Sequence, residues 1–143
     1  CTYICLTEAE KTRVEEFTSK AVAYLDENGT AAAYAAFNAP NPLPAFKDEE
    51  LYVFVIDISD ASNEIAIMVS HGFKDELIGQ NRYNTQDENG KYIVRDFIEL
   101  TKNSESSWSW YNWEDPTDNK VKKKFSYLIK YGALIVGAGT YLN

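Results

Sequence analysis

Cysteine and histidine are both scarce in this sequence. The 143-residue chain contains two cysteines, Cys1 and Cys5, and a single histidine, His71. A disulfide-rich scaffold distributes its cysteines through the whole chain, and a zinc site needs more ligands than two cysteines and one histidine supply. The sequence therefore argues against a disulfide scaffold and against a zinc centre.

Basic residues and long apolar runs are also few. Lysine and arginine number 14 against 22 acidic residues, which gives a net charge of −8. Nucleic-acid binding needs clustered lysine and arginine, and a membrane-spanning helix needs roughly 18 consecutive apolar residues. The longest apolar runs are only Ala31–Phe37 and Leu51–Ile56. We therefore expect no nucleic-acid partner and no membrane-spanning segment within this chain.

Core-forming residues, in contrast, are abundant. Hydrophobic residues make up 45% of the chain and aromatic residues 14%, a composition typical of a folded protein rather than a disordered one. The length suits one domain with a substantial core. No internal repeat or linker divides the sequence, so we expect a single domain over residues 1–143.

The first residue leaves two interpretations open. In an exported lipoprotein, the signal peptide is cleaved directly before a cysteine that then carries lipid, which makes Cys1 a lipidation candidate. Alternatively, Cys1 is the boundary of an excised fragment, and helices outside this chain would attach the domain to a membrane.

The N-terminal third carries helical signals. Thr7 and Glu10 fit a capping box, and Asn28-Gly29 is typical of a helix end. These signals predict a long helix over residues 7–28, then a short helix over Ala31–Phe37 and a proline-rich loop. The apolar residues that recur at helical spacing, and that we expect to face a sheet, are Val14, Phe17, Ala21 and Leu25.

The rest of the chain reads as strands with one helix among them. Apolar and β-branched runs predict strands at Leu51–Ile58, Ile65–Ser70, Ser107–Trp113, Lys122–Lys130 and Ala133–Tyr141, and helical spacing predicts a helix at Lys91–Asn103. The order predicts an α+β domain. In it, the long helix packs on one mainly antiparallel five-stranded sheet, and the sheet and its pocket region span about residues 50–141.

Six short motifs follow one another along most of the chain. They are Phe37-Asn38 with Leu51–Asp57, Ser70-His71-Gly72 with Leu77-Ile78-Gly79, Asp87–Lys91, Trp108–Pro116, Lys124–Tyr127 and Val136–Tyr141. In order and spacing they resemble the single Cache domain family (Cache type 2), extracytoplasmic sensor modules related to PAS domains. The resemblance implies a PAS-like fold with a small-molecule pocket over one face of the sheet. Ser107 and Trp110 depart from the family's usual residues, which affects the expected shape of the pocket floor.

The resemblance also implies a function. Family members occur as ectodomains of chemoreceptors and sensor kinases and as free-standing exported proteins, and many bind acetate, propionate or pyruvate. We therefore expect a periplasmic or extracytoplasmic domain that binds a small organic acid in signal transduction or chemotaxis. The alternative is a structural or interaction module whose pocket is collapsed and filled by Trp110 and its neighbours. In intact receptors of this family the long helix often joins two subunits, and we expect at most a weak homodimer in isolation.

Four residues are candidates for ligand binding. Strand alternation places Tyr111 and Trp113 on one face, where they offer an apolar wall and a hydroxyl group. Lys124 occupies the lysine of the family's Lys-x-x-Tyr pattern, and in a partly enclosed pocket its ammonium can pair with a carboxylate. His71 is a candidate donor at the pocket rim, on the strength of the His-Gly match.

Each candidate also has a plainer interpretation, as a core aromatic, a solvated strand end or a structural histidine. We expect Trp108 and Trp110 to be core residues. Catalysis is not expected, because no serine lies in a nucleophile elbow. A dinucleotide cofactor is not expected either, because no helix follows Gly137-Ala138-Gly139; the sequence points to no cofactor and no metal.

Overall fold

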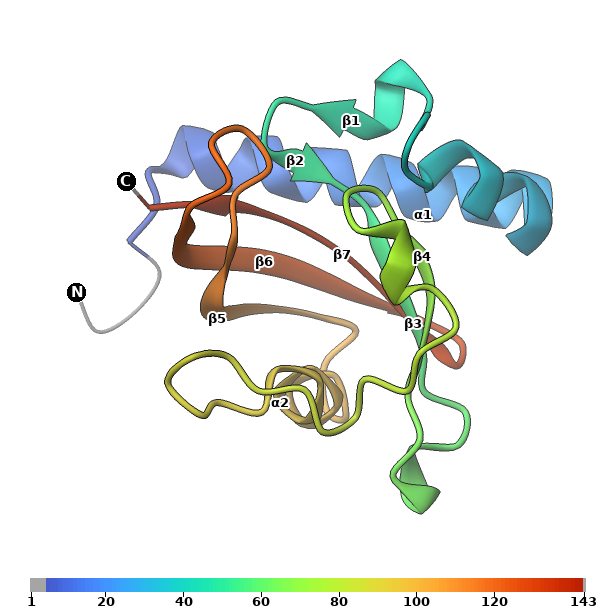
Figure 1. Ribbon diagram of the computed structural model, residues 1–143. Coiled ribbons are helices and arrows are strands. Elements are labelled where there is room, and N and C mark those ends of the chain that lie inside the picture. Colours follow the sequence, from blue (N-terminus) through green and yellow to red (C-terminus); the bar gives the residue numbers. More distant parts are fainter. Residues whose placement is uncertain (1–4, 143) are drawn as a thin grey trace.

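The computed structural model describes residues 5–142. Its elements are helix α1 (Glu8–Phe37), strands β1 (Lys47–Asp48), β2 (Leu51–Tyr52), β3 (Phe54–Asp57) and β4 (Ile67–His71), helix α2 (Ile93–Leu100), and strands β5 (Ser106–Glu114), β6 (Val121–Tyr131) and β7 (Leu134–Tyr141). Three short 3₁₀ helices lie between them: η1 (Pro44–Phe46), η2 (Ala61–Asn63) and η3 (Asp75–Leu77). Figure 1 shows the long helix α1 crossing one side of the sheet and the short helix α2 on the other.

Helix α1 begins and bends where the sequence predicts. The Thr7 hydroxyl accepts a hydrogen bond from the Glu10 amide at 3.1 Å, and the Glu10 carboxylate accepts one from the Thr7 amide at 3.2 Å. The predicted capping box is therefore confirmed. At Gly29 the backbone leaves the helical region (φ 82°, ψ 170°), which a residue without a Cβ adopts at little cost. The bend separates the long helix from the short one that follows it.

The main sheet has five strands in the order β4-β3-β7-β6-β5, and all neighbours are antiparallel. The predicted continuous strand over Leu51–Ile58 is wrong, because it divides at Val53. Strand β2 pairs with β1 in a separate two-stranded ribbon, whereas β3 pairs with β4 and β7. The predicted helix over Lys91–Asn103 is also shorter, since the chain is helical only from Ile93 to Leu100.

The sheet separates two apolar cores. On one face, the predicted stripe of α1 packs against inward-facing residues of the strands: Val14, Phe17, Ala21 and Leu25 with Val55, Val136 and Ala138. On the other face, α2 and the segment before it pack on the sheet: Ile93, Val94 and Phe97 with Phe54, Ile56, Leu128 and Ile135. The predicted packing of α1 is confirmed, and α2 covers the opposite face.

Trp110 is not a core residue. Its side chain is 43% exposed on the edge strand β5, and the ammonium groups of Lys91 and Lys123 lie 4.1 and 4.4 Å from its ring centre. The expectation of a core position for Trp110 is therefore wrong, and so is the alternative in which Trp110 fills the pocket, because the alternation of β5 turns it away from the face that carries α2. Trp108 does pack against the core on the α1 side, with its ring 5.2 Å from that of Tyr127.

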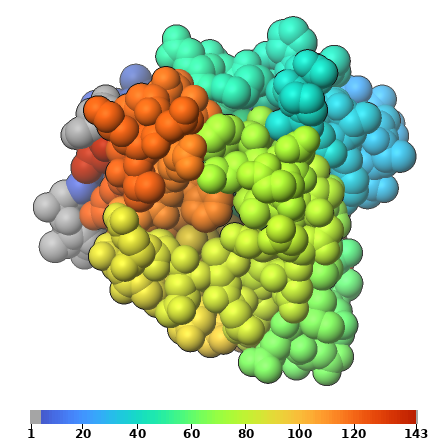
Figure 2. Space-filling view, in the orientation of Figure 1, coloured from blue at the N-terminus to red at the C-terminus, as the bar shows by residue number. Residues whose placement is uncertain are grey.

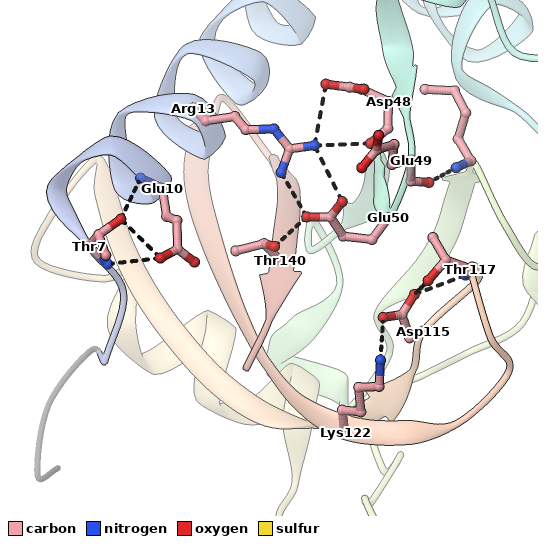
Figure 3. A network of polar contacts seen from close by, with 11 residues as sticks. Thr7, Glu10, Arg13, Asp48, Glu49, Glu50, Asp115, Thr117, Lys122 and Thr140 are labelled. Carbon is pink, nitrogen blue, oxygen red and sulfur yellow. Dashed lines mark hydrogen bonds and ion pairs between the residues drawn. The ribbon is translucent and has the colours of Figure 1, made fainter. Parts of the chain in front are cut away.

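A polar network ties the start of α1 to the edge of the sheet (Figure 3). Arg13 of α1 forms an ion pair with Glu50 at 2.7 Å, and Thr140 of β7 donates a hydrogen bond to the same carboxylate. Nearby, Lys122 of β6 pairs with Asp115 at 3.0 Å. The Arg13–Glu50–Thr140 contacts link the start of α1 to β7, and the Lys122–Asp115 pair links β6 to the turn that precedes it. Among residues 5–142, no helix is long and apolar enough to cross a membrane.

Candidate functional site

A small cavity lies between the α2 face of the sheet and the chain segment that precedes α2. It has a volume of about 30 Å³, enough for a few heavy atoms. Its walls come from β2, β3, β4, β5, β6, α2 and the connection before α2: Tyr52, Phe54, Ile56, Met68, His71, Arg82, Thr85, Ile93, Val94, Phe97, Tyr111, Trp113 and Lys124. The four residues predicted from the sequence to bind a ligand are all among them.

The lining of this cavity has a composition unlike that of the chain. The chain carries 22 acidic residues, yet no carboxylate is among the lining residues that the structure describes. Two cations are present, Lys124 and Arg82, together with hydrogen-bonding groups of tyrosine, tryptophan, histidine and threonine. The cavity on the α2 face of the sheet is therefore rich in hydrogen-bond donors, although the protein as a whole is strongly acidic.

Lys124 projects from β6 into the cavity, and its side chain is only 1% exposed. Its ammonium donates one hydrogen bond to the Tyr52 hydroxyl at 2.9 Å and lies 4.2 Å from the centre of the Tyr52 ring and 5.2 Å from that of Phe54. No carboxylate among residues 5–142 lies within 4.0 Å of it. Burial lowers the pKa of Lys124 to about 7, against a smaller opposing effect of Asp115.

The surroundings of Lys122 show the contrast. Lys122 lies two positions earlier on β6, and its ammonium pairs with Asp115 at 3.0 Å and with Asp118 at 2.7 Å.

The sequence predicts a partly enclosed pocket around Lys124, whereas the structure buries Lys124 almost completely. That prediction was wrong in degree, because β2 and its tyrosine cover the end of β6 from a distant part of the chain.

Tyr111 lies directly opposite Lys124 in the β5–β6 register, so both side chains leave the sheet on the same face. Its side chain is 3% exposed, and its hydroxyl shares a hydrogen bond with Ser126 at 2.9 Å. Burial raises the pKa of the Tyr111 phenol far above its ordinary value, so it stays protonated. The Tyr111–Ser126 pair has two hydroxyl hydrogens, and their shared bond uses one of them.

Trp113 forms the wall between this cavity and the surface. Its ring lies 6.3 Å from that of Tyr111, edge to face, and its buried indole Nε1 has no hydrogen-bond partner in the described part of the chain. On its outer side lies a shallow groove that Trp113 also lines, closed by an ion pair between Lys74 and Glu114 at 3.0 Å. In Figure 2, the groove lies where the orange β5–β6 region meets the yellow-green and yellow segments that follow β4.

His71 ends β4 and is 2% exposed, so it is a buried wall residue rather than the rim residue predicted from the sequence. Its Nδ1 accepts hydrogen bonds from the backbone amides of Phe73 and Lys74, at 3.2 and 2.8 Å. This pattern assigns the proton of the neutral ring to Nε2. Burial, aided by the positive charges of Lys124 and Lys74, lowers the pKa of His71 well below its usual range.

The cavity also contains residues that the sequence reasoning missed. Tyr52 is fully buried and bonds to Lys124, but in the sequence it reads as one more aromatic in an apolar strand. Arg82 comes from the long polar connection before α2, where no periodicity distinguishes it from its neighbours. The lipidation candidate, Cys1, lies outside the described residues.

Comparison with known structures gives the same fold. A methyl-accepting chemotaxis protein from Vibrio parahaemolyticus superposes with a TM-score of 0.76 at 20% identity, over 95% of this chain and 90% of that one. A Cache chemosensory domain described for carboxylic acid recognition gives a TM-score of 0.77 at 18% identity, over 94% and 95% of the two chains. The periplasmic sensor domain of a chemotaxis protein gives 0.66 at 23% identity, over 90% and 88%.

The family assignment rests on the sequence match. The family model named Single Cache domain 2 matches residues 19–143, a span that runs from the middle of α1 through the last strand and includes the whole cavity. The helix–sheet architecture and the antiparallel strand order agree with that assignment. The chain belongs to the single Cache domain 2 family of extracytoplasmic sensor domains.

Proposed function

We propose that this domain binds a small monocarboxylate of the acetate, propionate or pyruvate class in the cavity behind β5 and β6, and that it acts in signal transduction or chemotaxis. One observation carries the proposal. The cavity holds a buried lysine, Lys124, with no carboxylate of the described protein beside it. A buried charge without a partner is costly, so a ligand anion would supply the missing counterion.

The geometry suggests a role for each polar group. Lys124 would pair with one carboxylate oxygen, and the Tyr111–Ser126 hydroxyl pair could turn its remaining hydrogen toward the ligand. The Nε2–H of His71 and the unpartnered Nε1–H of Trp113 are further donors at the same cavity. The apolar walls, including Phe97 of α2, would contact the carbon chain.

The size of the cavity limits the ligand. A volume of about 30 Å³ holds two or three water-sized groups, so the shortest acids fit best, and the walls would have to move outward to admit a whole acetate, propionate or pyruvate ion. Among residues 5–142, no acidic residue lines the cavity to hold an ammonium group, so an α-amino acid would leave its amine without a partner. The relative described for carboxylic acid recognition supports the same ligand class, and the two chemotaxis proteins support the proposed role in chemotaxis.

Thermal-shift screening against short organic acids and amino acids tests the proposal. A ligand present at about a hundred times its Kd stabilises the fold by roughly 2.7 kcal/mol, which moves the melting temperature by several degrees. Titration calorimetry on the best acid should then give an affinity that Lys124→Met weakens by roughly 1.5–3 kcal/mol. Lys124→Arg should also bind poorly, because the enclosed site has no room for a planar guanidinium.

Lys122→Met is the matched control, because Lys122 lies on the same strand with its charge already paired at the surface. Its affinity should equal that of the parent. If no short acid stabilises the domain, the proposal is wrong, and the second candidate, an interaction module whose small cavity stays closed, takes its place.

A further inference from the structure

We propose that the cavity takes up its ligand together with one proton, which goes from solvent to the amine of Lys124. This inference rests on the proposed carboxylate site and adds a feature of it, the coupling of binding to pH. The domain would then respond to the concentration of a short acid and to the acidity of its surroundings through a single side chain.

The geometry around Lys124 carries the inference. The Nζ atom has one hydrogen-bond partner, the neutral phenol of Tyr52, and its other near neighbours are aromatic rings: Phe54 at 5.2 Å, Tyr141 at 5.7 Å and Tyr111 at 5.9 Å from Nζ to the ring centres. A side chain that is 1% exposed has no bulk water to solvate an ammonium. Such an environment favours the neutral amine, while a carboxylate beside it favours the ammonium.

The three phenols and the histidine around the cavity do not change state near neutral pH. Burial raises the pKa values of the three phenols, of Tyr52 on β2, Tyr111 on β5 and Tyr141 on β7, so they stay protonated. His71 on β4 stays neutral, because burial lowers its pKa well below its usual range.

Other charged groups lie in the cavity wall or beside it. Arg82, which lines the cavity, keeps its positive charge, and Lys74 is held in an ion pair with Glu114. Asp115 stays ionised: the hydrogen bonds from Thr117 and Lys122 outweigh the effect of its burial, and its pKa is lowered. Lys124, with a pKa near 7, is the group at this cavity that titrates in the physiological range.

The proton balance of the step is simple. The amine of Lys124 and a carboxylate ligand combine with one proton from the buffer to give an ammonium–carboxylate pair, and no bond between heavy atoms forms or breaks. Well above pH 7 each binding event therefore takes up about one proton, and near pH 6 it takes up about a tenth of one. The apparent affinity should fall about tenfold for each pH unit above pH 7 or so.

Titration calorimetry with propionate measures this uptake directly. The observed heat is compared in two buffers that hold the same pH but differ in their heat of ionisation, cacodylate and Bis-Tris at pH 6.0 and borate and Tris at pH 8.5, because the difference between buffers reports the number of protons exchanged. We expect close to one proton at pH 8.5 and about 0.1 at pH 6.0. Propionamide, which has nearly the same shape but no charge, should bind without proton uptake at either pH.

Two variants complete the experiment. Lys124→Met should bind propionate weakly, with no proton uptake and no dependence on pH between 6 and 8.5. Lys122→Met, on the neighbouring surface position of the same strand, should keep the parent's proton uptake and pH dependence. As a readout on the ligand-free protein, the ¹³Cε resonance of Lys124 should titrate near pH 7 and lose that titration when propionate saturates the site.

The results separate the two proposals. Propionate binding without proton uptake at pH 8.5 overturns the proton coupling and leaves the carboxylate site standing. A Lys124 resonance that titrates only above pH 9 in the ligand-free protein overturns it as well. If neither propionate nor any other short acid binds, the carboxylate site itself is wrong, and the proton coupling fails with it.

Discussion

Replacing Lys124 by methionine should make the ligand-free domain more stable near neutral pH, although the residue is almost completely buried. The pKa of Lys124 falls from 10.5 to about 7 on folding. Since each tenfold change in proton affinity corresponds to about 1.4 kcal/mol, folding with a charged Lys124 costs roughly 5 kcal/mol. Methionine has a similar length and no charge. It loses the hydrogen bond to Tyr52, worth about 1 kcal/mol, and its thioether takes the place of the ammonium against the Tyr52 ring. We therefore expect a gain of about 3–4 kcal/mol at pH 6.

The sign of the pH dependence provides the sharper check. Below about pH 7 Lys124 is charged in both the folded and the unfolded protein, so the folded protein is destabilised by the full free-energy cost of burying the ammonium. Between pH 7 and 10.5 the unfolded chain binds more protons, so the parent gains stability as the pH rises. The advantage of Lys124→Met should therefore be roughly 2–3 kcal/mol smaller at pH 9 than at pH 6.

Urea denaturation of both proteins, followed by tryptophan fluorescence at pH 6 and pH 9, measures the two differences. Taking the difference between parent and variant cancels the other titrating groups, and Lys122→Met serves as the control for removing a lysine from β6. A Lys124→Met protein that is less stable than the parent at pH 6, or an advantage that does not change with pH, would refute the reasoning. Lys124 would then be a well-solvated ammonium in the folded state.

Three further changes test the packing. Tyr111→Phe should cost about 1 kcal/mol in urea denaturation, because the Ser126 hydroxyl loses its partner; adding Ser126→Ala should recover part of that loss. Gly139→Ala should destabilise the fold by about 1–3 kcal/mol, because the new Cβ would lie 2.4 Å from the carbonyl oxygen of Phe125. An unchanged midpoint of urea denaturation would mean that β6 and β7 can separate locally. Thr7→Ala removes the cap of α1 and should cost about 1 kcal/mol in thermal unfolding, whereas an equal melting temperature would show that the helix start frays in the parent.

Local chemistry was enough to predict most of the elements. The Thr7 cap and the Asn28-Gly29 stop act within a few residues of the backbone they affect, so they can be recognised without the fold. Alternation along the β5 and β6 segments likewise placed Tyr111, Trp113 and Lys124 on defined faces, because successive side chains of a strand always point to opposite sides. The residue motifs then indicated the family, and the antiparallel five-stranded sheet follows it.

The burial of a side chain, in contrast, depends on which other segments of the chain pack against it, and those segments are often distant in the sequence. Trp110 and Trp113 are both tryptophans on β5, yet Trp110 is 43% exposed beside two lysines, while Trp113 is partly buried and lines the small cavity. Their local sequences do not distinguish them; the position of α2 and its preceding loop on one face does.

Lys124 makes the same point most clearly. The sequence determined that it shares a face with Ser126, because strand alternation needs only neighbouring residues. That Tyr111 lies on the same face was decided by the register of β5 against β6. That its ammonium would be fully enclosed, bonded to Tyr52 from 72 positions away and left without a carboxylate, was decided by the tertiary structure alone. The pKa of a side chain depends on every group within several ångströms, and those groups are brought together only when the chain folds.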